Sequence, residues 1–370
     1  MTDKKKDQPK KAILAAGGTG GHLFPALALA EELSKDGWKI MIVTDARGAE
    51  YQGKYQHYDF QVVSSSTVKS GLTGKFKTLA SLGKGTMQSA KLLNKFKPDV
   101  VVGFGGYPCF PPLFTAQITR IPTVLHEQNA VLGKANKMLA ASATTIALSL
   151  PNTKGVSNHK KFNAKAVVTG NPVRPEIVAK QNAAYQTPDD NGPFRIFVMG
   201  GSQGASIFSE IIPAAIAKLP DSLKNRLVIS QQCRPEDLND VQKIYDDLGV
   251  KSELKSFFTD VPDQLEKCHL FIGRSGASTV ADVSIVGRPA IYVPLKHADM
   301  QQKLNADVVA DIGGAWVMMQ EDFTASALAA QIEQHATNPD TLETAAKNAA
   351  KAGQPNAARN LANTVKKAAL

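Results

Sequence analysis

The feature that most limits how this chain can fold is a local pattern that occurs twice. The apolar run at residues 12–15 leads into the turn Gly17-Gly18-Thr19-Gly20-Gly21-His22. The run at residues 195–199 leads into a second turn, 183 residues after the first, Gly200-Gly201-Ser202-Gln203-Gly204-Ala205. Glycine lets the backbone turn sharply between a strand and a helix and come close to a ligand. Two domains of similar size that open in the same way are the simplest explanation.

Other β-branched runs alternate with longer helical stretches throughout the 370 residues. They lie at residues 39–43, 100–102, 123–125, 144–147, 227–229, 270–272 and 290–293. This alternation predicts an α/β fold with doubly wound parallel sheets that helices cover on both faces.

The boundary between the domains is expected near residue 170, because Pro172 and Pro175 interrupt the pattern there. We therefore assign residues 1–170 to an N-terminal domain and residues 171–344 to a C-terminal domain. The alanine-rich segment 345–370 is helical by propensity. It is long enough to pack back onto the N-terminal domain, although nothing in its own sequence requires this.

The composition excludes several classes of protein. Apolar residues make up 43% of the chain and charged residues 21%, which rules out a disordered or collagen-like chain. No apolar run is long enough for a membrane-spanning helix, and the lysine-rich start lacks the apolar stretch of a secretory signal. The cysteines at 109, 233 and 268 are too few for a disulfide framework or a zinc site. We expect a cytosolic protein.

Basic residues are concentrated in the first half. Residues 1–170 hold 23 Lys and Arg against 10 Asp and Glu, whereas residues 171–370 hold 20 against 23. This asymmetry indicates contact with a polyanionic surface, either nucleic acid or an anionic membrane. Residues 68–97 contain no acidic residue and mix lysines with apolar side chains, among them Lys69, Lys75, Lys77, Lys84, Leu72, Phe76 and Leu79. Such a stretch can bind to the surface of an anionic membrane through its lysines. Alternatively, its apolar side chains belong to the core of the domain, and the two interpretations are compatible.

The first glycine turn predicts an anion site, because free N–H groups at a helix start attract negative charge. A dinucleotide fingerprint through Gly18, Gly20 and Asp45 is one alternative, but Leu23 stands where its third glycine should be. A second alternative is that residues 17–21 form only a tight turn between strand and helix and bind no ligand. His22 is a candidate general base, since a helix N-terminus favours the neutral imidazole; the alternative is a surface or capping histidine.

The second half has two glycine-rich helix starts, at residues 200–205 and 273–280, which suits a diphosphate-linked nucleotide. Asp282 either accepts hydrogen bonds from sugar hydroxyls or only compensates the helix dipole. Gln301, Gln302 and Asn305 share one helix face, which suits sugar hydroxyls or a solvated surface.

Two loops of the first half, at residues 103–108 and 126–129, each follow a strand. Ligands of open α/β sheets bind beyond the carboxyl ends of the strands. We therefore expect these loops and residues 17–22 to converge on one crevice.

Together these motifs resemble those of the MurG-type glycosyltransferases. Seven collinear blocks carry the resemblance, at residues 17–25, 105–108, 126–130, 170–174, 200–205, 274–277 and 301–305. It implies a GT-B fold, with two Rossmann-like domains facing each other across a cleft. It also implies an inverting transfer of N-acetylglucosamine from UDP-N-acetylglucosamine to lipid I, which gives the peptidoglycan precursor lipid II. The implied location is the cytoplasmic face of the bacterial inner membrane, to which such an enzyme binds peripherally.

The resemblance also assigns substrate-binding residues. Arg174 and Ser202 would contact the diphosphate with Gln203 nearby, and the backbone at Phe258 would meet the uracil. The nucleotide and its ribose would be lined by Ala277, Ser278, Thr279, Val280, Ala281 and Asp282. The sugar would be read by Gln301, Gln302 and Asn305 and covered from the other side by Thr19, Gly20, Gly21 and Asn129, with Tyr107 as a further substrate-binding residue. Because Asp282 stands where the family usually has glutamate, its contact is expected to be longer or water-mediated.

His22 is then the expected general base, with Glu127 in reserve. Arg174 and the helix starts would stabilise the leaving diphosphate. The sequence has no Asp-x-Asp motif, so we expect no obligatory divalent metal and no other cofactor. The expected partners are the sugar nucleotide, lipid I and an anionic membrane surface, without nucleic acid.

Three alternatives stay open. Another UDP-sugar enzyme of the same fold, a 2-epimerase or a glycolipid synthase, would share these motifs. An NAD-dependent dehydrogenase would use Asp45. A nucleic-acid-binding protein would use the basic half, although that half lacks a basic, aromatic-rich element.

Overall fold

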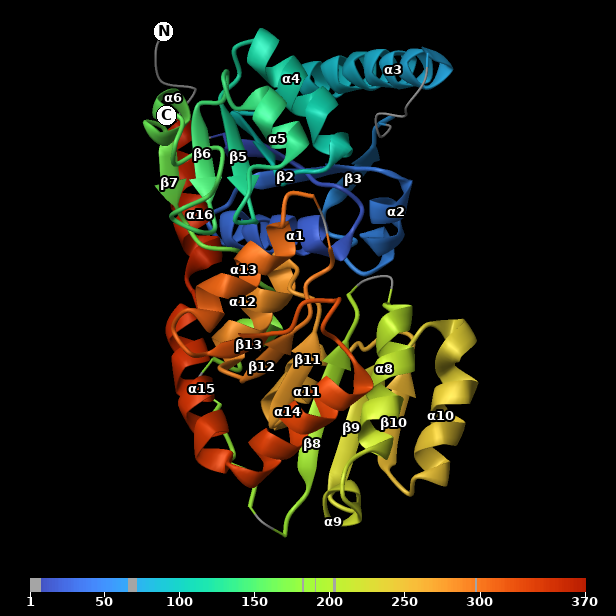
Figure 1. The fold of residues 1–370 in the computed structure, drawn as a ribbon. Coiled ribbons are helices and arrows are strands. Elements are labelled where there is room, and N and C mark those ends of the chain that lie inside the picture. Colours follow the sequence, from blue (N-terminus) through green and yellow to red (C-terminus); the bar gives the residue numbers. More distant parts are fainter. Residues whose placement is uncertain (1–7, 66–71, 182, 190, 202–203, 297) are drawn as a thin grey trace, which may run out of the picture. The chain divides into compact units, whose positions relative to one another are not determined.

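The computed structural model describes residues 8–65, 72–181, 183–189, 191–201, 204–296 and 298–370, and of residues 72–79 only the backbone. The chain divides into two compact units (Figure 1). The N-terminal domain comprises Met1–Arg174 together with Asn356–Leu370, and the C-terminal domain comprises Pro175–Pro355.

The N-terminal domain is built on a sheet of seven parallel strands. They are β1 (Lys11–Ala15), β2 (Lys39–Thr44), β3 (Asp59–Val62), β4 (Val100–Gly103), β5 (Thr123–Glu127), β6 (Thr145–Leu148) and β7 (Ala166–Val168). Their order in the sheet is β3-β2-β1-β4-β5-β6-β7. The order reverses at β1, which pairs with β2 on one side and with β4 on the other. This switch places the carboxyl ends of β1 and β4 side by side, where open α/β sheets bind ligands.

Helices cover both faces of this sheet. They are α1 (Gly20–Lys35), α2 (Ala46–Ala49), α3 (Leu72–Phe96), α4 (Phe110–Ile118), α5 (Lys134–Leu139), α6 (Lys160–Asn163) and α16 (Ala357–Ala368), with short 3-10 turns η1 (Glu50–Gly53) and η2 (Tyr107–Cys109). Ala12 and Leu14 of β1 join one core with α1 and α16, whereas Ile13 and Ala15 join a second core with residues of α3, α4 and α5. The alternation of side chains along the strand is what supplies both cores.

The C-terminal domain repeats this architecture with six parallel strands. They are β8 (Phe194–Met199), β9 (Leu227–Gln232), β10 (Lys251–Lys255), β11 (Leu270–Gly273), β12 (Ala290–Tyr292) and β13 (Ala315–Val317). Their order is β10-β9-β8-β11-β12-β13, which again reverses at the first strand of the domain. The prediction of two doubly wound parallel-sheet domains is therefore confirmed.

The helices of the C-terminal domain complete its layers. They are α7 (Pro175–Val178), α8 (Ser206–Ala217), α9 (Asp221–Lys224), α10 (Leu238–Asp247), α11 (Val261–Lys267), α12 (Ala277–Val286), α13 (Gln301–Ala310), α14 (Ala325–Thr337) and α15 (Pro339–Ala352), with the 3-10 turn η3 (Pro235–Asp237). Phe194, Ile196 and Val198 of β8 share a core with residues of α8, α10 and α14. Phe197 points to the other face, where its ring meets that of Phe258 edge-on.

The alanine-rich tail is two helices rather than one. Helix α15 packs against α12 within the C-terminal domain, and residues 353–355 end it. Only α16 returns to the N-terminal domain, where Leu361, Ala362 and Val365 are buried beside α1. The returning segment thus begins at Asn356 instead of residue 345, and the first crossing follows Arg174 instead of residue 170.

Candidate active site

The glycine turn after β1 is held tightly by its neighbours. The N–H of Gly17 donates to the carbonyl of Gly105 at 3.2 Å. A Cβ on Gly18 would lie 1.9 Å from Asp45 Oδ1, and a Cβ on Gly20 would lie 2.9 Å from the Phe24 ring. Packing inside the domain therefore requires glycine at position 18, where a Cβ would also lie 2.5 Å from the backbone nitrogen of Gly48, independently of any ligand.

The three loops expected to meet do so at the carboxyl ends of β1, β4 and β5, which are adjacent in the sheet. The carbonyl of Gly105, in the loop after β4, accepts from the N–H of Gly17 in the loop after β1. Gln128, in the loop after β5, hydrogen-bonds to His22. Gln128 also donates to the carbonyl of Phe104, in the loop after β4. The predicted convergence within the N-terminal domain is confirmed.

His22 lies in the first turn of α1 and is half-buried. Its ring packs against glycine backbone: a Cβ on Gly17 would be 3.0 Å from His22 Cδ2, and one on Gly105 would be 3.4 Å from Cε1. Its Nδ1 lies 2.9 Å from Oε1 of Gln128, a side chain that is only 5% exposed. Gln128 was not among the predicted site residues, although it lies in the 126–129 loop and in the 126–130 motif.

Glu127, the expected reserve base, is buried at the end of β5. Its Oε1 accepts from the backbone N–H and the side-chain amide of Asn129, each at 3.1 Å. Its Oε2 accepts from the N–H of Gly133 at 2.8 Å and from Nδ2 of Asn136 at 2.9 Å. These four bonds hold the loop that carries Asn129 and engage both carboxylate oxygens of Glu127.

Arg174 is brought to the same helix as His22. Its guanidinium carbon lies 5.0 Å from the centre of the Phe24 ring, which is two residues beyond His22 in α1. The ring of Tyr51 meets Phe24 edge-on at 5.6 Å. A cation held over an aromatic face is attracted by the ring quadrupole, so Phe24 helps to fix where this arginine lies.

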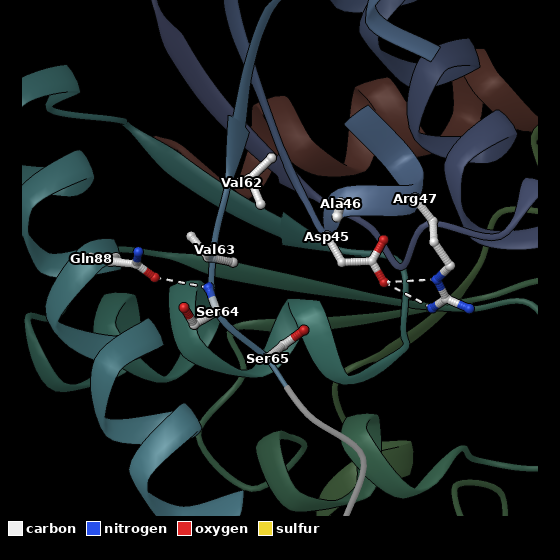
Figure 2. A pocket seen from close by; sticks show the side chains of 8 residues that line it. All are labelled: Asp45, Ala46, Arg47, Val62, Val63, Ser64, Ser65 and Gln88. Carbon is white, nitrogen blue, oxygen red and sulfur yellow. Dashed lines mark hydrogen bonds and ion pairs between the residues drawn. The ribbon is translucent and has the colours of Figure 1, made fainter. Parts of the chain in front are cut away.

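A cavity of about 350 Å³ lies beyond the ends of β2 and β3 (Figure 2). Asp45 is on its wall, and Figure 2 shows its carboxylate turned toward Arg47. Oδ2 accepts from Arg47 Nη2 at 2.8 Å, and Oδ1 accepts from the N–H of Gly48 at 3.1 Å. Because this carboxylate caps α2 and pairs with arginine, it is poorly available for the ribose contact that the dehydrogenase alternative needs.

In the C-terminal domain the turn after β8 uses glycine at two left-handed positions, Gly201 at φ 91° and Gly204 at φ 69°. The N–H of Gly200 donates to Oε1 of Gln232 at 3.1 Å. The predicted diphosphate ligands Ser202 and Gln203 lie outside the described residues.

The second glycine turn leads from β11 into α12, with Gly276 at the N-cap. The six residues predicted to line the nucleotide are all half-buried: Ala277, Ser278, Thr279, Val280, Ala281 and Asp282. Asn305 of α13 is buried, and its Nδ2 donates to the carbonyl of Ser275 at 3.2 Å. This bond ties α13 to the turn before α12.

The remaining predicted donor residues lie close to that turn or in the core. Gln301 and Gln302 open α13 and are half-buried, and Gln302 Oε1 accepts from the N–H of Leu295 at 2.9 Å. Phe258 is buried with its ring against Phe197, so its side chain is not available to a ligand, and the backbone contact with uracil stays a prediction. Among the described residues, no cluster of three or more His, Cys, Asp or Glu side chains could hold a metal ion.

Comparisons with known proteins cover both domains. The glycosyltransferase family 28 N-terminal domain matches residues 12–148, and the glycosyltransferase family 28 C-terminal domain matches residues 195–361. A relative from Rhodospirillum centenum, named UDP-N-acetylglucosamine--N-acetylmuramyl-(pentapeptide) pyrophosphoryl-undecaprenol N-acetylglucosamine transferase, is 49% identical over 95% of this chain and 93% of its own length. A relative of the same name from Paramagnetospirillum magneticum is 45% identical over 95% of both chains.

A similar solved structure is that of Acinetobacter baumannii MurG. It covers 97% of this chain and 100% of its own, with a TM-score of 0.77 and 29% sequence identity. The two parallel-sheet domains described above are those of a GT-B fold. With both family domains matched in order and relatives above 40% identity along nearly the whole length, this chain belongs to glycosyltransferase family 28, among the MurG-type enzymes.

Proposed function

We propose that this protein transfers N-acetylglucosamine from UDP-N-acetylglucosamine to lipid I, the undecaprenyl-diphospho-N-acetylmuramoyl-pentapeptide, and so produces lipid II for peptidoglycan. The observation that carries the proposal is the 49% identity, over 95% of the chain, to a protein named as that transferase. A fold alone would not distinguish it from other UDP-sugar enzymes.

The proposed reaction is a single displacement. The 4-hydroxyl of the muramoyl sugar attacks the anomeric carbon from the face opposite UDP, so the configuration inverts. His22 accepts the hydroxyl proton. Negative charge that builds on the leaving diphosphate is stabilised by Arg174 and by the N-termini of α8 and α12, because a helix start carries partial positive charge.

The donor is proposed to bind the C-terminal domain. Its diphosphate would meet the turns at residues 200–205 and 273–277, and its ribose and sugar would meet Asp282, Gln301 and Gln302. The half-buried surface of residues 277–282 supports this placement. Asn305 is more suited to shaping the site than to a direct contact, because its buried amide donates to Ser275.

A divalent metal is not proposed as a requirement. Arg174 and two helix starts supply the positive charge that a metal would otherwise bring to a diphosphate. Transfer should therefore continue at an unchanged rate in the presence of a chelator.

The enzyme is proposed to work at the cytoplasmic face of the inner membrane, where its lipid acceptor lies. In the described part of α3, Lys84, Met87, Lys91 and Lys95 are spaced to share one face, and all four are exposed. The neighbouring helix α4 exposes Phe114 and Ile118. Among the described residues, no helix is long and apolar enough to cross a bilayer. Basic and apolar side chains together suit binding to the surface of an anionic leaflet.

The decisive experiment follows a label from UDP-N-acetylglucosamine. Purified enzyme is incubated with lipid I, with a diacylglycerol acceptor, or with no acceptor. Label in lipid II alone supports the proposal. Label in the diacylglycerol product would indicate a glycolipid synthase, and formation of UDP-N-acetylmannosamine without an acceptor would indicate a 2-epimerase.

A further inference from the structure

We propose that Gln128 is a positioning residue that decides which ring nitrogen of His22 carries the proton. The inference deepens the proposed function and rests on it, because it matters for catalysis only if His22 is the base. Its basis is a short chain of two hydrogen bonds, from His22 through Gln128 to the backbone of Phe104.

The direction of both bonds follows from chemistry. Nε2 of Gln128 lies 3.0 Å from the carbonyl oxygen of Phe104, and a carbonyl oxygen can only accept. The amide must therefore point its NH₂ group at Phe104, and its oxygen Oε1 faces His22 Nδ1 at 2.9 Å. The reversed amide would set two oxygens against each other in a buried place, which is unfavourable.

An oxygen that can only accept requires a donor opposite it. In the neutral ring, Nδ1 of His22 must carry the hydrogen, and Nε2 must keep its lone pair. Among the described residues of its own domain, none hydrogen-bonds to Nε2. The nitrogen left without a hydrogen is thus the one whose lone pair can take the proton of the acceptor's hydroxyl.

The surroundings keep the ring from turning over. Cδ2 of His22 faces Gly17 and Gly106, where Cβ atoms would lie at 3.0 Å and 3.4 Å, and Cε1 faces Gly105. A half-turn of the ring would exchange Nδ1 with Cδ2 and remove the bond to Gln128. Close backbone on one edge and a fixed amide on the other therefore select one orientation.

The proton balance follows from this arrangement. As the 4-hydroxyl oxygen bonds to the anomeric carbon, its proton moves to the lone pair on Nε2, and the bond from that carbon to the diphosphate breaks with its electron pair leaving on UDP. The ring becomes imidazolium, and its Nδ1–H bond to Oε1 becomes charge-assisted. Gln128 gives this stabilisation without adding a negative charge beside the ring.

Other titratable groups near His22 should not contribute to the pH–rate profile in the neutral range. Burial lowers the pKa of His126 to about 4 and raises the pKa of the Cys109 thiol to about 12. Neither group therefore titrates in the neutral range. Asp45 and Glu127 are carboxylates held by the hydrogen bonds described above, and none of these four side chains changes in the variants below.

The first test reads the tautomer directly, without activity. In full-length protein labelled with ¹⁵N-histidine, long-range ¹H–¹⁵N spectra distinguish Nδ1–H from Nε2–H rings, and the His22 signals are assigned by their loss in His22→Ala. We expect Nδ1–H in the native chain and a population of Nε2–H in Gln128→Met, which has a similar shape but no acceptor. An Nε2–H ring in the native protein would overturn the proposal even if the variant failed to fold.

The second test is kinetic. Gln128→Met should lower kcat by about tenfold to 100-fold, because the ring no longer stays in the productive tautomer, with little change in KM for UDP-N-acetylglucosamine. Gln128→Glu keeps an acceptor opposite Nδ1 but can bond the Phe104 carbonyl only as a protonated carboxyl, so it should retain more kcat than Gln128→Met. Once ionised, it adds negative charge beside the ring, which moves the acidic limb of the pH–rate profile upward. The matched control is Gln117→Met, which also loses an amide hydrogen bond, to Leu139 at 3.0 Å, but does not contact His22.

The outcomes separate the two proposals. Equal losses of kcat in both Gln128 variants would mean that Gln128 only holds the loop, and the positioning role would be wrong. If His22→Ala keeps most of its turnover, the assignment of the base fails, whatever the spectra show for Gln128.

Discussion

At the scale of single residues, the arrangement around His22 suits removal of a proton more than capping or binding. The side chain is half-buried, lies against glycine backbone and is oriented by an amide. His22→Ala should lower kcat by about 100-fold or more, as expected for a lost general base, while UDP affinity changes little. Labelled transfer and calorimetric titration with UDP measure the two quantities. Replacing the exposed His57 in the same way is the control, and a loss of less than about tenfold would contradict the assignment.

Gly18 gives a prediction about packing. In Gly18→Ala the new Cβ would meet Asp45 Oδ1 at 1.9 Å and the backbone nitrogen of Gly48 at 2.5 Å. Because backbone cannot move aside easily, we expect a loss of about 1–3 kcal/mol in the free energy of unfolding of the N-terminal domain. Gly53→Ala is the matched control, since nothing lies within 4 Å of its Cβ position. Chemical denaturation should separate the two variants.

His335 gives a prediction about pH. It is buried in α14 against Trp316, and burial lowers its pKa to about 4. Between pH 6.5 and about pH 4, His335 is protonated in the unfolded chain but stays neutral in the folded chain. The free energy of unfolding therefore falls as the pH falls, by at most about 1.4 kcal/mol per pH unit. His335→Leu should make this loss less steep in urea unfolding at pH 7 and pH 5. The exposed His57→Leu should not, and an unchanged slope in the His335 variant would refute the prediction.

At the scale of elements, helix α3 carries the proposed membrane contact. Reversing Lys84, Lys91 and Lys95 to glutamate should weaken binding to anionic vesicles by at least about tenfold, since each lysine contributes about 1 kcal/mol near such a surface. Transfer to a soluble acceptor analogue should be unaffected. The control reverses three exposed lysines of the other domain, Lys218, Lys243 and Lys251. Equal vesicle binding by both triple variants would exclude this face.

Helix α16 is expected to stabilise the N-terminal domain although it comes from the other end of the chain. Leu361 is fully buried in the core that contains Leu14 and α1. Leu361→Ala should reduce the free energy of unfolding of the N-terminal domain by about 2–5 kcal/mol. The unfolding of the C-terminal domain should not change, which domain-specific hydrogen exchange would show. Exposed Asn363→Ala is the control, and a loss spread over both domains would contradict the assignment of α16.

The sequence predicted the inner strands of both sheets but none of the edge strands. The four strands without an expectation are β3, β7, β10 and β13, and these are the outermost strands of the two sheets. An edge strand has one neighbour and stays partly exposed, so its composition is mixed, as in Lys-Ser-Glu-Leu-Lys of β10. A search for apolar β-branched runs finds only strands that are buried on both faces.

At the scale of the whole molecule, the domain order and the loops that meet around His22 followed from the sequence, because parallel strands bring their carboxyl ends to one edge. The division of residues 345–370 between the two domains could not be predicted from the sequence. Helices α15 and α16 are both rich in alanine, and only the surface against which each one packs assigns it to a domain. The hydrogen bond between Gln128 and His22 also could not be predicted, since it joins residues 106 positions apart.

The crossing of α16 has a consequence for synthesis on the ribosome. The N-terminal sheet is translated first, but the helix that completes one of its cores is translated last, after the entire C-terminal domain. At about 5–20 residues per second, the apolar strip beside α1 stays uncovered for on the order of ten seconds or more. The N-terminal domain is therefore the first to begin synthesis and the last to be completed. In a nascent chain the apolar surface beside α1 therefore stays exposed until Asn356–Leu370 is made, and a premature stop before Asn356 leaves that surface uncovered.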